Sequence, residues 1–327
     1  MVTEKLLNWF TENKRDLLWR HTSDPYKIWV SEIMLQQTRV EAVIPYYHRF
    51  LEALPDVSAL AEAEEETLLK LWEGLGYYSR VRNMQKAARE IVKLGDFPKT
   101  AQELKKLPGF GEYTAGSVSS IAFGCRAPAV DGNVLRVFAR LTTEENDILS
   151  PAVRKKCAAW VMENMPENAY SGDCNQALME LGACVCLPKS PKCELCPLKE
   201  ECGAFAEDMT QDFPVKAPKG EKVTEEFTVY LWTEDGKVLV RKRPEKGLLA
   251  GLYEFPHHID EKNVRVLGEA CEVRHIFTHK IWLMRGVFAE MTGNVEGTWV
   301  DAKELERLPM ASAMERFRKA VLERIRK

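Results

Sequence analysis

Apolar residues recur at helical spacing through the first part of the chain. They do so in residues 5–10, 28–51, 66–76, 84–95, 114–124 and 134–142, and Pro- or Gly-containing turn signals separate these stretches. The pattern predicts that residues 1–205 are almost entirely helical and belong to a first domain of residues 1–212.

The pattern changes after a Pro- and Lys-rich stretch, residues 213–224, which predicts a linker. Residues 227–244 then alternate between apolar and polar around Asp235-Gly236, which is a hairpin signal. Residues 281–291 and 297–300 predict further strands, and residues 314–327 predict a basic helix. The sequence therefore predicts an α+β domain over residues 225–327.

The composition fits two globular domains, because the chain has 327 residues of which 45% are hydrophobic and 29% are charged. No apolar run is long enough to cross a membrane, and the start of the chain lacks the pattern of a signal peptide, so we expect a cytoplasmic protein. The net charge of −3 does not by itself indicate a nucleic-acid partner. Nine cysteines in a reducing compartment favour metal binding over disulfides.

Four of these cysteines gather in one short, Pro-bearing, basic loop at the end of the first domain. They are Cys186, Cys193, Cys196 and Cys202. Four thiolates at this spacing can converge on one metal centre, and both zinc and a 4Fe–4S cluster accept such a set. The spacing alone leaves the two metals open.

A glycine-rich turn between two helical stretches is a candidate phosphate site. In residues 104–122, Gly109 and Gly111 permit a turn whose backbone N–H groups point outward, beside the positive N-terminus of the second helix. The alternative interpretation is an ordinary helix–helix turn that contains a Pro and two Gly. The pattern L-P-G-F-G-x-x-T-A matches the helix–hairpin–helix DNA-binding motif closely, which favours contact with a DNA backbone.

Two carboxylates suggest cleavage of a glycosidic bond. Glu32 lies in a largely apolar helical stretch, where burial raises a carboxyl pKa and suits the group to deliver a proton near neutral pH. Asp131 precedes a helix, where its ordinary role is an N-cap. One group could protonate the leaving base while the other stabilises an oxocarbenium-like sugar.

With these motifs in this order, the first domain resembles the endonuclease III superfamily of DNA glycosylases, and in detail the MutY adenine glycosylases. The resemblance covers nearly the whole first domain and is carried by LLWR, SEIMLQQTRV, WEGLGYYSRVRN, LPGFGEYTAG, AVDGNV, NQALMELGACVC and the cysteine loop. It implies a 4Fe–4S cluster on the four cysteines and base-excision repair by hydrolysis of the N-glycosidic bond of adenine opposite 8-oxoguanine or guanine.

The resemblance also implies roles for individual residues. Glu32 would be the general acid and Asp131 the carboxylate that faces the sugar cation, with Tyr113 and Asn133 as supporting residues. The remaining matched positions are Arg20, Leu35 and Gln176 in the adenine pocket, Gln37 and Tyr77 as wedges in the base stack, and Arg80 and Arg82 on the DNA backbone.

One position separates members of this superfamily. Bifunctional relatives place a Schiff-base Lys two residues after the second hairpin Gly, and this chain has Tyr113 there. Because an imine requires an amine, we expect a monofunctional glycosylase. An endonuclease III-like glycosylase/lyase for oxidised pyrimidines is the alternative. A non-catalytic DNA-binding module with structural zinc is a third, which the intact pair Glu32 and Asp131 disfavours.

The second domain resembles Nudix domains through GLLAGLYEFP, although the carboxylates that bind metal in active Nudix hydrolases are missing. In MutY proteins this domain recognises 8-oxoguanine. Phe277, Thr278 and His279 match the family's Phe-Ser-His loop, with Thr keeping the hydroxyl and adding a methyl. We therefore expect a monomer that acts on duplex DNA with A:8-oxoguanine or A:G mispairs, in the bacterial cytoplasm at the nucleoid.

Overall fold

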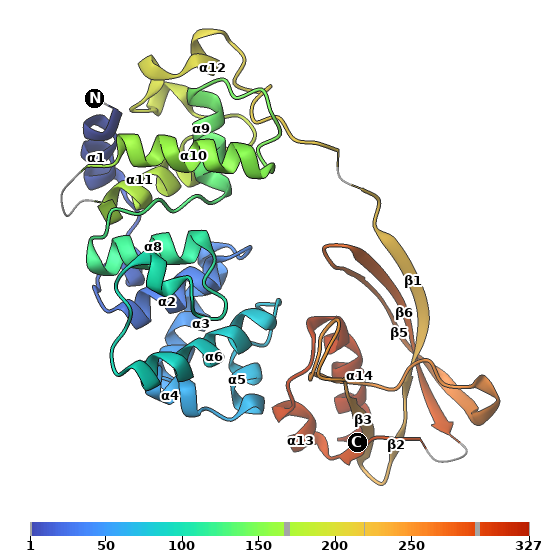
Figure 1. Ribbon diagram of the computed structural model, residues 1–327. Helices are drawn as coiled ribbons and strands as arrows, with labels where there is room; N and C mark the ends of the chain where they lie inside the picture. Colours follow the sequence, from blue (N-terminus) through green and yellow to red (C-terminus); the bar gives the residue numbers. More distant parts are fainter. Residues whose placement is uncertain (1, 167–170, 219, 292–294, 327) are drawn as a thin grey trace. The chain divides into compact units, whose positions relative to one another are not determined.

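The computed structural model describes residues 2–166, 171–218, 220–291 and 295–326, which divide into two compact units (Figure 1). The helical unit consists of residues 2–62 and 82–218, and the sheet unit consists of residues 63–81 and 220–326. The predicted fold class, a helical domain followed by an α+β domain, is confirmed. The predicted limits 1–212, 213–224 and 225–327 stay a prediction, and residues 1, 167–170, 219, 292–294 and 327 within them lie outside the described residues.

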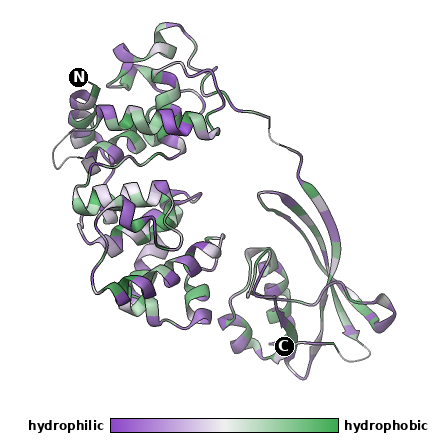
Figure 2. Cartoon of the chain, in the orientation of Figure 1, coloured by the Kyte–Doolittle hydropathy of each residue, from purple (hydrophilic) through white to green (hydrophobic). Residues whose placement is uncertain are grey.

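The helical unit packs amphipathic helices around an apolar core. Leu6 and Phe10 from the first helix meet Phe138 and Leu178 from two later ones, and Figure 2 shows apolar and polar residues interleaved along these helices. The helices are α1 (Val2–Asn13), α2 (Pro25–Leu35), α3 (Val40–Ala53), α4 (Val57–Glu62), most of α6 (Ser79–Leu94), α7 (Ala101–Leu104), α8 (Glu112–Phe123), α9 (Gly132–Leu141), α10 (Pro151–Asn164), α11 (Ser171–Cys184) and α12 (Gly203–Ala206).

Side chains in the sequence fix where several helices begin. Asp24 accepts a hydrogen bond from the backbone N–H of Tyr26, and Pro25 follows it at the first helical position of α2. Thr100 and Glu103 form a capping box at α7. These caps satisfy N–H groups that a helix cannot pair internally, so they set the entry point of each helix.

The stretch of helical periodicity over residues 28–51 forms two helices rather than one. Helix α2 ends at Leu35 and α3 begins at Val40, so residues 36–39 break the run. Gln37 takes a φ of 60°, in the left-handed region that costs a residue with a Cβ about 1–3 kcal/mol. Periodicity continues across the break because both helices bury apolar faces, which hides the interruption.

The sheet unit contains a sheet of long strands in the order β1 (Val223–Leu231), β6 (Lys280–Met291), β5 (Val264–Ile276). Strand β1 runs parallel to β6, and β5 runs antiparallel to it (Figure 1). A second sheet pairs β3 (Lys237–Lys242) with β2 (Thr233–Glu234), β4 (Tyr253–Glu254) and β7 (Thr298–Val300). The helices of this unit are α5 (Glu65–Leu71), α13 (Ala302–Arg307) and α14 (Glu315–Ile325).

Most elements of the sheet unit agree with the sequence prediction. The hairpin at Asp235-Gly236 is present, and positive φ values of 46° and 73° at the two residues fit the turn that joins twisted strands. Strand β5 was not predicted, because none of its positions is fully buried and its pattern of exposure does not alternate strictly. Among the described residues, no helix is both long and apolar enough to span a bilayer.

The packing of α8 generates a stability prediction. A Cβ added to Gly116 would lie 2.0 Å from the carbonyl oxygen of Pro128, which is backbone and cannot rotate away. We expect Gly116→Ala to lower the free energy of unfolding by about 1–3 kcal/mol, as overpacked cores do. Urea denaturation measures this.

The matched control is Gly132→Ala, another helical glycine whose added Cβ would meet nothing within 4 Å. This variant should unfold close to the wild-type midpoint. Equal destabilisation of the two variants would contradict the close-packing explanation.

Candidate active site

The Glu32 carboxyl is buried in the helical unit, with 5% of the residue exposed. Its Oε2 accepts hydrogen bonds from the Tyr113 hydroxyl and the Ser117 hydroxyl, each at 2.6 Å. Burial raises the pKa of Glu32 above the ordinary carboxyl range, and the charge of Asp131 acts in the same direction. The two hydroxyls and the charge of Arg20 oppose that rise. The protonated form of this carboxyl is therefore more favourable than that of a carboxyl in water.

Asp131 is the N-cap of α9 and is fully engaged by donors. Its Oδ1 accepts from the backbone N–H groups of Asn133 and Val134, both at 2.8 Å, and its Oδ2 accepts from Asn133 Nδ2 at 2.8 Å. Burial raises the pKa of Asp131, while these donors and the charge of Arg136 favour the carboxylate. Arg136 also donates to Asn133 Oδ1 at 2.9 Å, which fixes the side-chain amide. Asp131 is therefore an N-cap of α9, and hydrogen bonds to both of its oxygens fix its carboxyl group.

Tyr113 and Ser117 lie four residues apart on α8, so both hydroxyls face one point on α2. Tyr113 is one of the predicted supporting residues, and its hydroxyl also lies 3.4 Å from Met179 Sδ. Ser117 was missed. The only signal for it was a small polar residue one helical turn after Tyr113, in a stretch rich in Ser, Ala and Gly.

Arg20, a predicted adenine-pocket residue, is held by Glu180. Arg20 NH2 and Arg15 Nε each lie 2.8 Å from a Glu180 carboxylate oxygen, and the Glu180 side chain is 1% exposed. These two arginines hold the pKa of Glu180 at about 2, against the opposite effect of burial. The other predicted pocket residues, Leu35 on α2 and Gln176 on α11, are half-buried.

The predicted helix–hairpin–helix turn is present between α7 and α8. Gly109 has a φ of 81°, and a Cβ there would lie 2.8 Å from Asn83 Cβ, so both conformation and space require glycine. Gly111 is the N-cap of α8 and is exposed. Phe110, between them, is buried and stacks on Trp29 at 5.0 Å. The turn is anchored from within and leaves its glycines toward solvent.

The four loop cysteines line one cavity of about 30 Å³. Arg140, which is 2% exposed, fastens the loop: its NH1 lies 3.3 Å from Cys186 Sγ and 2.7 Å from the Leu187 carbonyl oxygen. Cys202 Sγ in turn lies 3.4 Å from the Arg140 carbonyl oxygen. Within the described ranges, no three Cys, His, Asp or Glu side chains are close enough together to hold a single ion. Four thiols that line one cavity are a donor set that a 4Fe–4S cluster accepts.

The predicted wedge and base-reading residues take defined positions. Gln37, in the helical unit, and Tyr77, in the sheet unit, are exposed and both have positive φ, of 60° and 49°. The Tyr77 hydroxyl lies 2.6 Å from Thr278 Oγ1, at the turn between β5 and β6. Phe277 stacks edge-on against Trp282, and His279 is exposed.

The two predicted phosphate-binding arginines differ in their surroundings. Arg80 NH2 donates to the carbonyl oxygens of Leu75 and Gly76, both at 3.1 Å, and its guanidinium lies over the Tyr77 ring. Burial lowers the pKa of Arg80 to about 10. Arg82 is half-buried on α6. The contacts of Arg80 indicate that it supports the turn carrying Tyr77, and contact of either arginine with DNA stays a prediction.

Comparison with known proteins shows the family. Residues 30–163 match the HhH-GPD superfamily of base excision DNA repair proteins, and residues 227–320 match the NUDIX domain. An adenine DNA glycosylase of Buchnera aphidicola (strain Bp) is 33% identical over 90% of this chain and 90% of its own length. The chain belongs to the adenine DNA glycosylases.

Other members of the family support this assignment. Adenine DNA glycosylases of Arabidopsis thaliana and Mus musculus are 38% and 37% identical over 77% and 84% of this chain. The chain spans about half the length of the Arabidopsis relative, which it covers to 46%. The comparisons favour an adenine DNA glycosylase over the endonuclease III-like alternative.

Solved structures confirm the fold of the helical unit. A thermostable thymine-DNA glycosylase matches with a TM-score of 0.57 and 27% identity, covering 63% of this chain and 95% of its own. Endonuclease III in a non-covalent DNA complex matches with a TM-score of 0.53 and 25% identity, covering 64% and 95%. The resemblance predicted from the motifs is therefore confirmed, while the roles of the individual residues stay predictions.

The hydrogen bonds at Glu32 generate a titration prediction. Because the Ser117 hydroxyl stabilises the charged form, Ser117→Ala should raise the pKa of Glu32 further. Carboxyl-carbon NMR during a pH titration measures the change. Ser119→Ala is the matched control, since Ser119 is buried on the same helix but donates to the Gly116 carbonyl. A fall in the Glu32 pKa of the Ser117 variant would contradict the assignment.

Proposed function

We propose that this chain removes adenine that is paired with 8-oxoguanine or guanine in duplex DNA, by hydrolysis of the N-glycosidic bond. The observation that carries the proposal is the buried Glu32 carboxyl with its two hydroxyl donors, near enough to the Asp131 carboxyl to feel its charge. Membership of the adenine DNA glycosylases supports the choice of base.

In this mechanism Glu32 begins protonated and donates its proton to a ring nitrogen of adenine. The bond between that base and the sugar C1′ then breaks, and its electron pair leaves with the base. Asp131 stabilises the positive charge that develops on the sugar, held in place by Asn133. Water adds to C1′ and releases a proton, so the products are free adenine and an abasic site.

The adenine must leave the duplex to reach a buried carboxyl, at a cost of a few kcal/mol that a mispair reduces. The positive φ values of Gln37 and Tyr77 support their role as wedges, because such strain is stored where an exposed side chain must be presented. The exposed glycines of the hairpin supply backbone N–H groups for a phosphate. Endonuclease III, a structural neighbour, was solved in a complex with DNA, which supports DNA as the partner.

We infer that Cys186, Cys193, Cys196 and Cys202 hold a 4Fe–4S cluster, because the four thiols line one cavity and Arg140 lies against it. When bound, the cluster would cross-link the loop through metal–thiolate bonds. The chain's own contribution is the Arg140 anchor, which joins the loop to α9. We further infer that Phe277, Thr278 and His279 read the base opposite adenine, and that the protein acts as a monomer at the bacterial nucleoid.

The role of Glu32 generates the first activity prediction. Glu32→Gln removes the transferable proton, so adenine release should fall by a factor of at least about 10². Incubation with a duplex carrying A opposite 8-oxoguanine, followed by alkali to cleave abasic sites, measures the rate. Glu144→Gln replaces a buried carboxylate that binds Lys156, so it should retain activity. Full turnover by the Glu32 variant would remove the residue from the mechanism.

Tyr113 generates the prediction that separates a hydrolase from a lyase. A phenol cannot form an imine, so borohydride should trap no covalent complex between the wild-type protein and its substrate DNA. Tyr113→Lys introduces an amine beside Glu32 and should make trapping detectable by gel electrophoresis. Efficient trapping of the wild type would instead favour the glycosylase/lyase alternative.

A further inference from the structure

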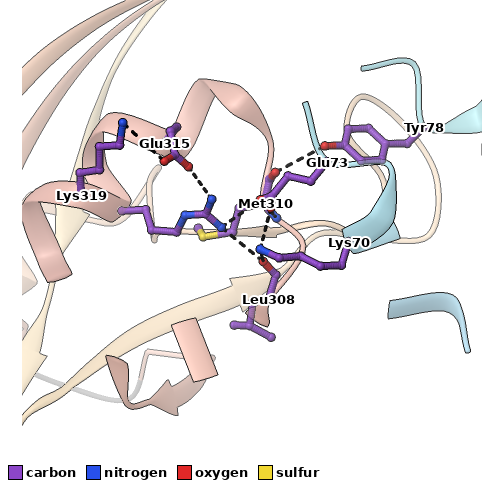
Figure 3. A network of polar contacts seen from close by, with 8 residues as sticks. Lys70, Glu73, Tyr78, Leu308, Met310, Glu315 and Lys319 are labelled. Atoms are coloured by element: carbon purple, nitrogen blue, oxygen red, sulfur yellow. Dashed lines mark hydrogen bonds and ion pairs between the residues drawn. The ribbon is translucent and has the colours of Figure 1, made fainter. Parts of the chain in front are cut away.

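Residues 63–81 lie within the stretch that matches the HhH-GPD superfamily, yet they pack with the sheet unit. Glu73 makes the central contact of this segment. Its Oε1 accepts from Arg318 NH1 at 2.9 Å and from the Met310 backbone N–H at 3.2 Å (Figure 3). The side chains of Glu73 and Arg318 are 16% and 12% exposed. We call this pair the Glu73–Arg318 clamp.

The clamp is supported from both sides. Lys70 Nζ donates to Glu73 Oε2 at 2.6 Å, and Arg318 NH2 donates to Glu315 Oε2 at 2.5 Å. The Tyr78 hydroxyl lies 3.5 Å from the Met310 carbonyl oxygen, so both polar backbone groups of Met310 contact the segment. A charge pair with this little solvent exposure is screened less than a surface pair, and loss of one partner leaves the other poorly solvated.

The segment that the clamp holds, residues 63–81, carries Tyr77. The Trp72 indole N–H donates to the Gly76 carbonyl at 3.0 Å, and Arg80 donates to the same oxygen at 3.1 Å. These bonds fix the turn that gives Tyr77 its positive φ. The position of the Tyr77 hydroxyl against Thr278 Oγ1 therefore depends on where Glu73 is held.

The other end of the clamp leads to Thr278. Arg318 lies on α14, where Arg316 NH1 donates to the Glu272 carbonyl of β5 at 2.9 Å. Phe317 on the same helix is fully buried, and a Cβ on Gly286 of β6 would lie 2.5 Å from its ring. Helix α14 thus sits directly on the two strands whose connecting turn carries Thr278.

We propose that the Glu73–Arg318 clamp is a specificity-determining device, which holds the Tyr77 wedge and the Thr278 hydroxyl at a fixed separation for reading the base opposite adenine. The inference rests on the proposed functions of Tyr77 and Thr278. Glu73 and Arg318 are positioning residues, because they act through the turn and the helix. Loss of the clamp loosens the reading of 8-oxoguanine against guanine and leaves the proton transfer at Glu32 unchanged.

The test is single-turnover adenine release by the full chain, opposite 8-oxoguanine and opposite guanine, with urea denaturation of each variant. Glu73→Gln and Arg318→Gln should each lower the ratio of the two rates by about tenfold, the change that 1.4 kcal/mol of lost coupling produces. The rate opposite guanine should stay the same. The double variant should lose no more than either single variant, because both substitutions break one contact.

Two further variants separate this role from general destabilisation. Lys319→Gln removes a neighbouring charge that is 70% exposed and should leave the ratio unchanged. Thr278→Ala should lower the ratio by itself, and adding Glu73→Gln to it should cause no further loss. An unchanged ratio in the clamp variants, or equal loss of both rates, overturns the proposal.

Failure of the proposed function would look different. If the wild type releases no adenine from either duplex, the function fails, and fluorine NMR of 3-fluorotyrosine at Tyr77 still tests the clamp. Thr278→Ala and Glu73→Gln should then displace the Tyr77 resonance in the same direction, while Lys319→Gln should not. A Tyr77 resonance that responds to Thr278→Ala but not to Glu73→Gln overturns the proposal in that case.

Discussion

The Glu32 carboxyl takes its hydrogen bonds from two neutral hydroxyls rather than from a cation. Since a hydroxyl can donate or accept, Tyr113 and Ser117 can satisfy this group with or without its proton. Glu180, another buried carboxyl of the helical unit, has two arginines instead, which hold its pKa at about 2. The partners of these two buried carboxyls thus differ, and their pKa values shift in opposite directions.

The sequence predicted which residues make up the candidate site, but it did not predict most of the contacts between them. Glu32, Asp131 and Tyr113 fall in short motifs, and the structure brings all three into mutual electrostatic contact. The sequence could not predict that Ser117 donates a hydrogen bond to Glu32, or that Arg20 donates one to Glu180. Both contacts join elements that lie far apart along the chain. Such pairs depend on how helices pack, which local periodicity does not encode.

The fold shows the same division between local and long-range information. Turn chemistry predicted the hairpin at Asp235-Gly236, because two residues with positive φ are a local requirement. The break at residues 36–39 was hidden, since Gln37 is an ordinary helix former placed in a conformation that it disfavours. Strand β5 was hidden for another reason. It pairs with β6 over most of its length, but much of it faces solvent, so its sequence lacks the apolar pattern of a buried strand.

Residues 63–81 belong to the sheet unit, although the residues on both sides of them in the sequence belong to the helical unit. This affects the design of truncated forms of the protein. Judged from the order of the elements along the sequence, a fragment that ends at residue 218 would contain the complete helical unit and nothing of the sheet unit. In fact this fragment also contains residues 63–81, without their partners. Glu73 would lose its hydrogen bonds from Arg318 and Met310, and Glu66 would lose the 2.9 Å hydrogen bond from the Tyr253 hydroxyl. In such a fragment residues 63–81 lack their partners from the sheet unit. Its stability and activity therefore reflect the loss of these contacts as well as the properties of the helical unit.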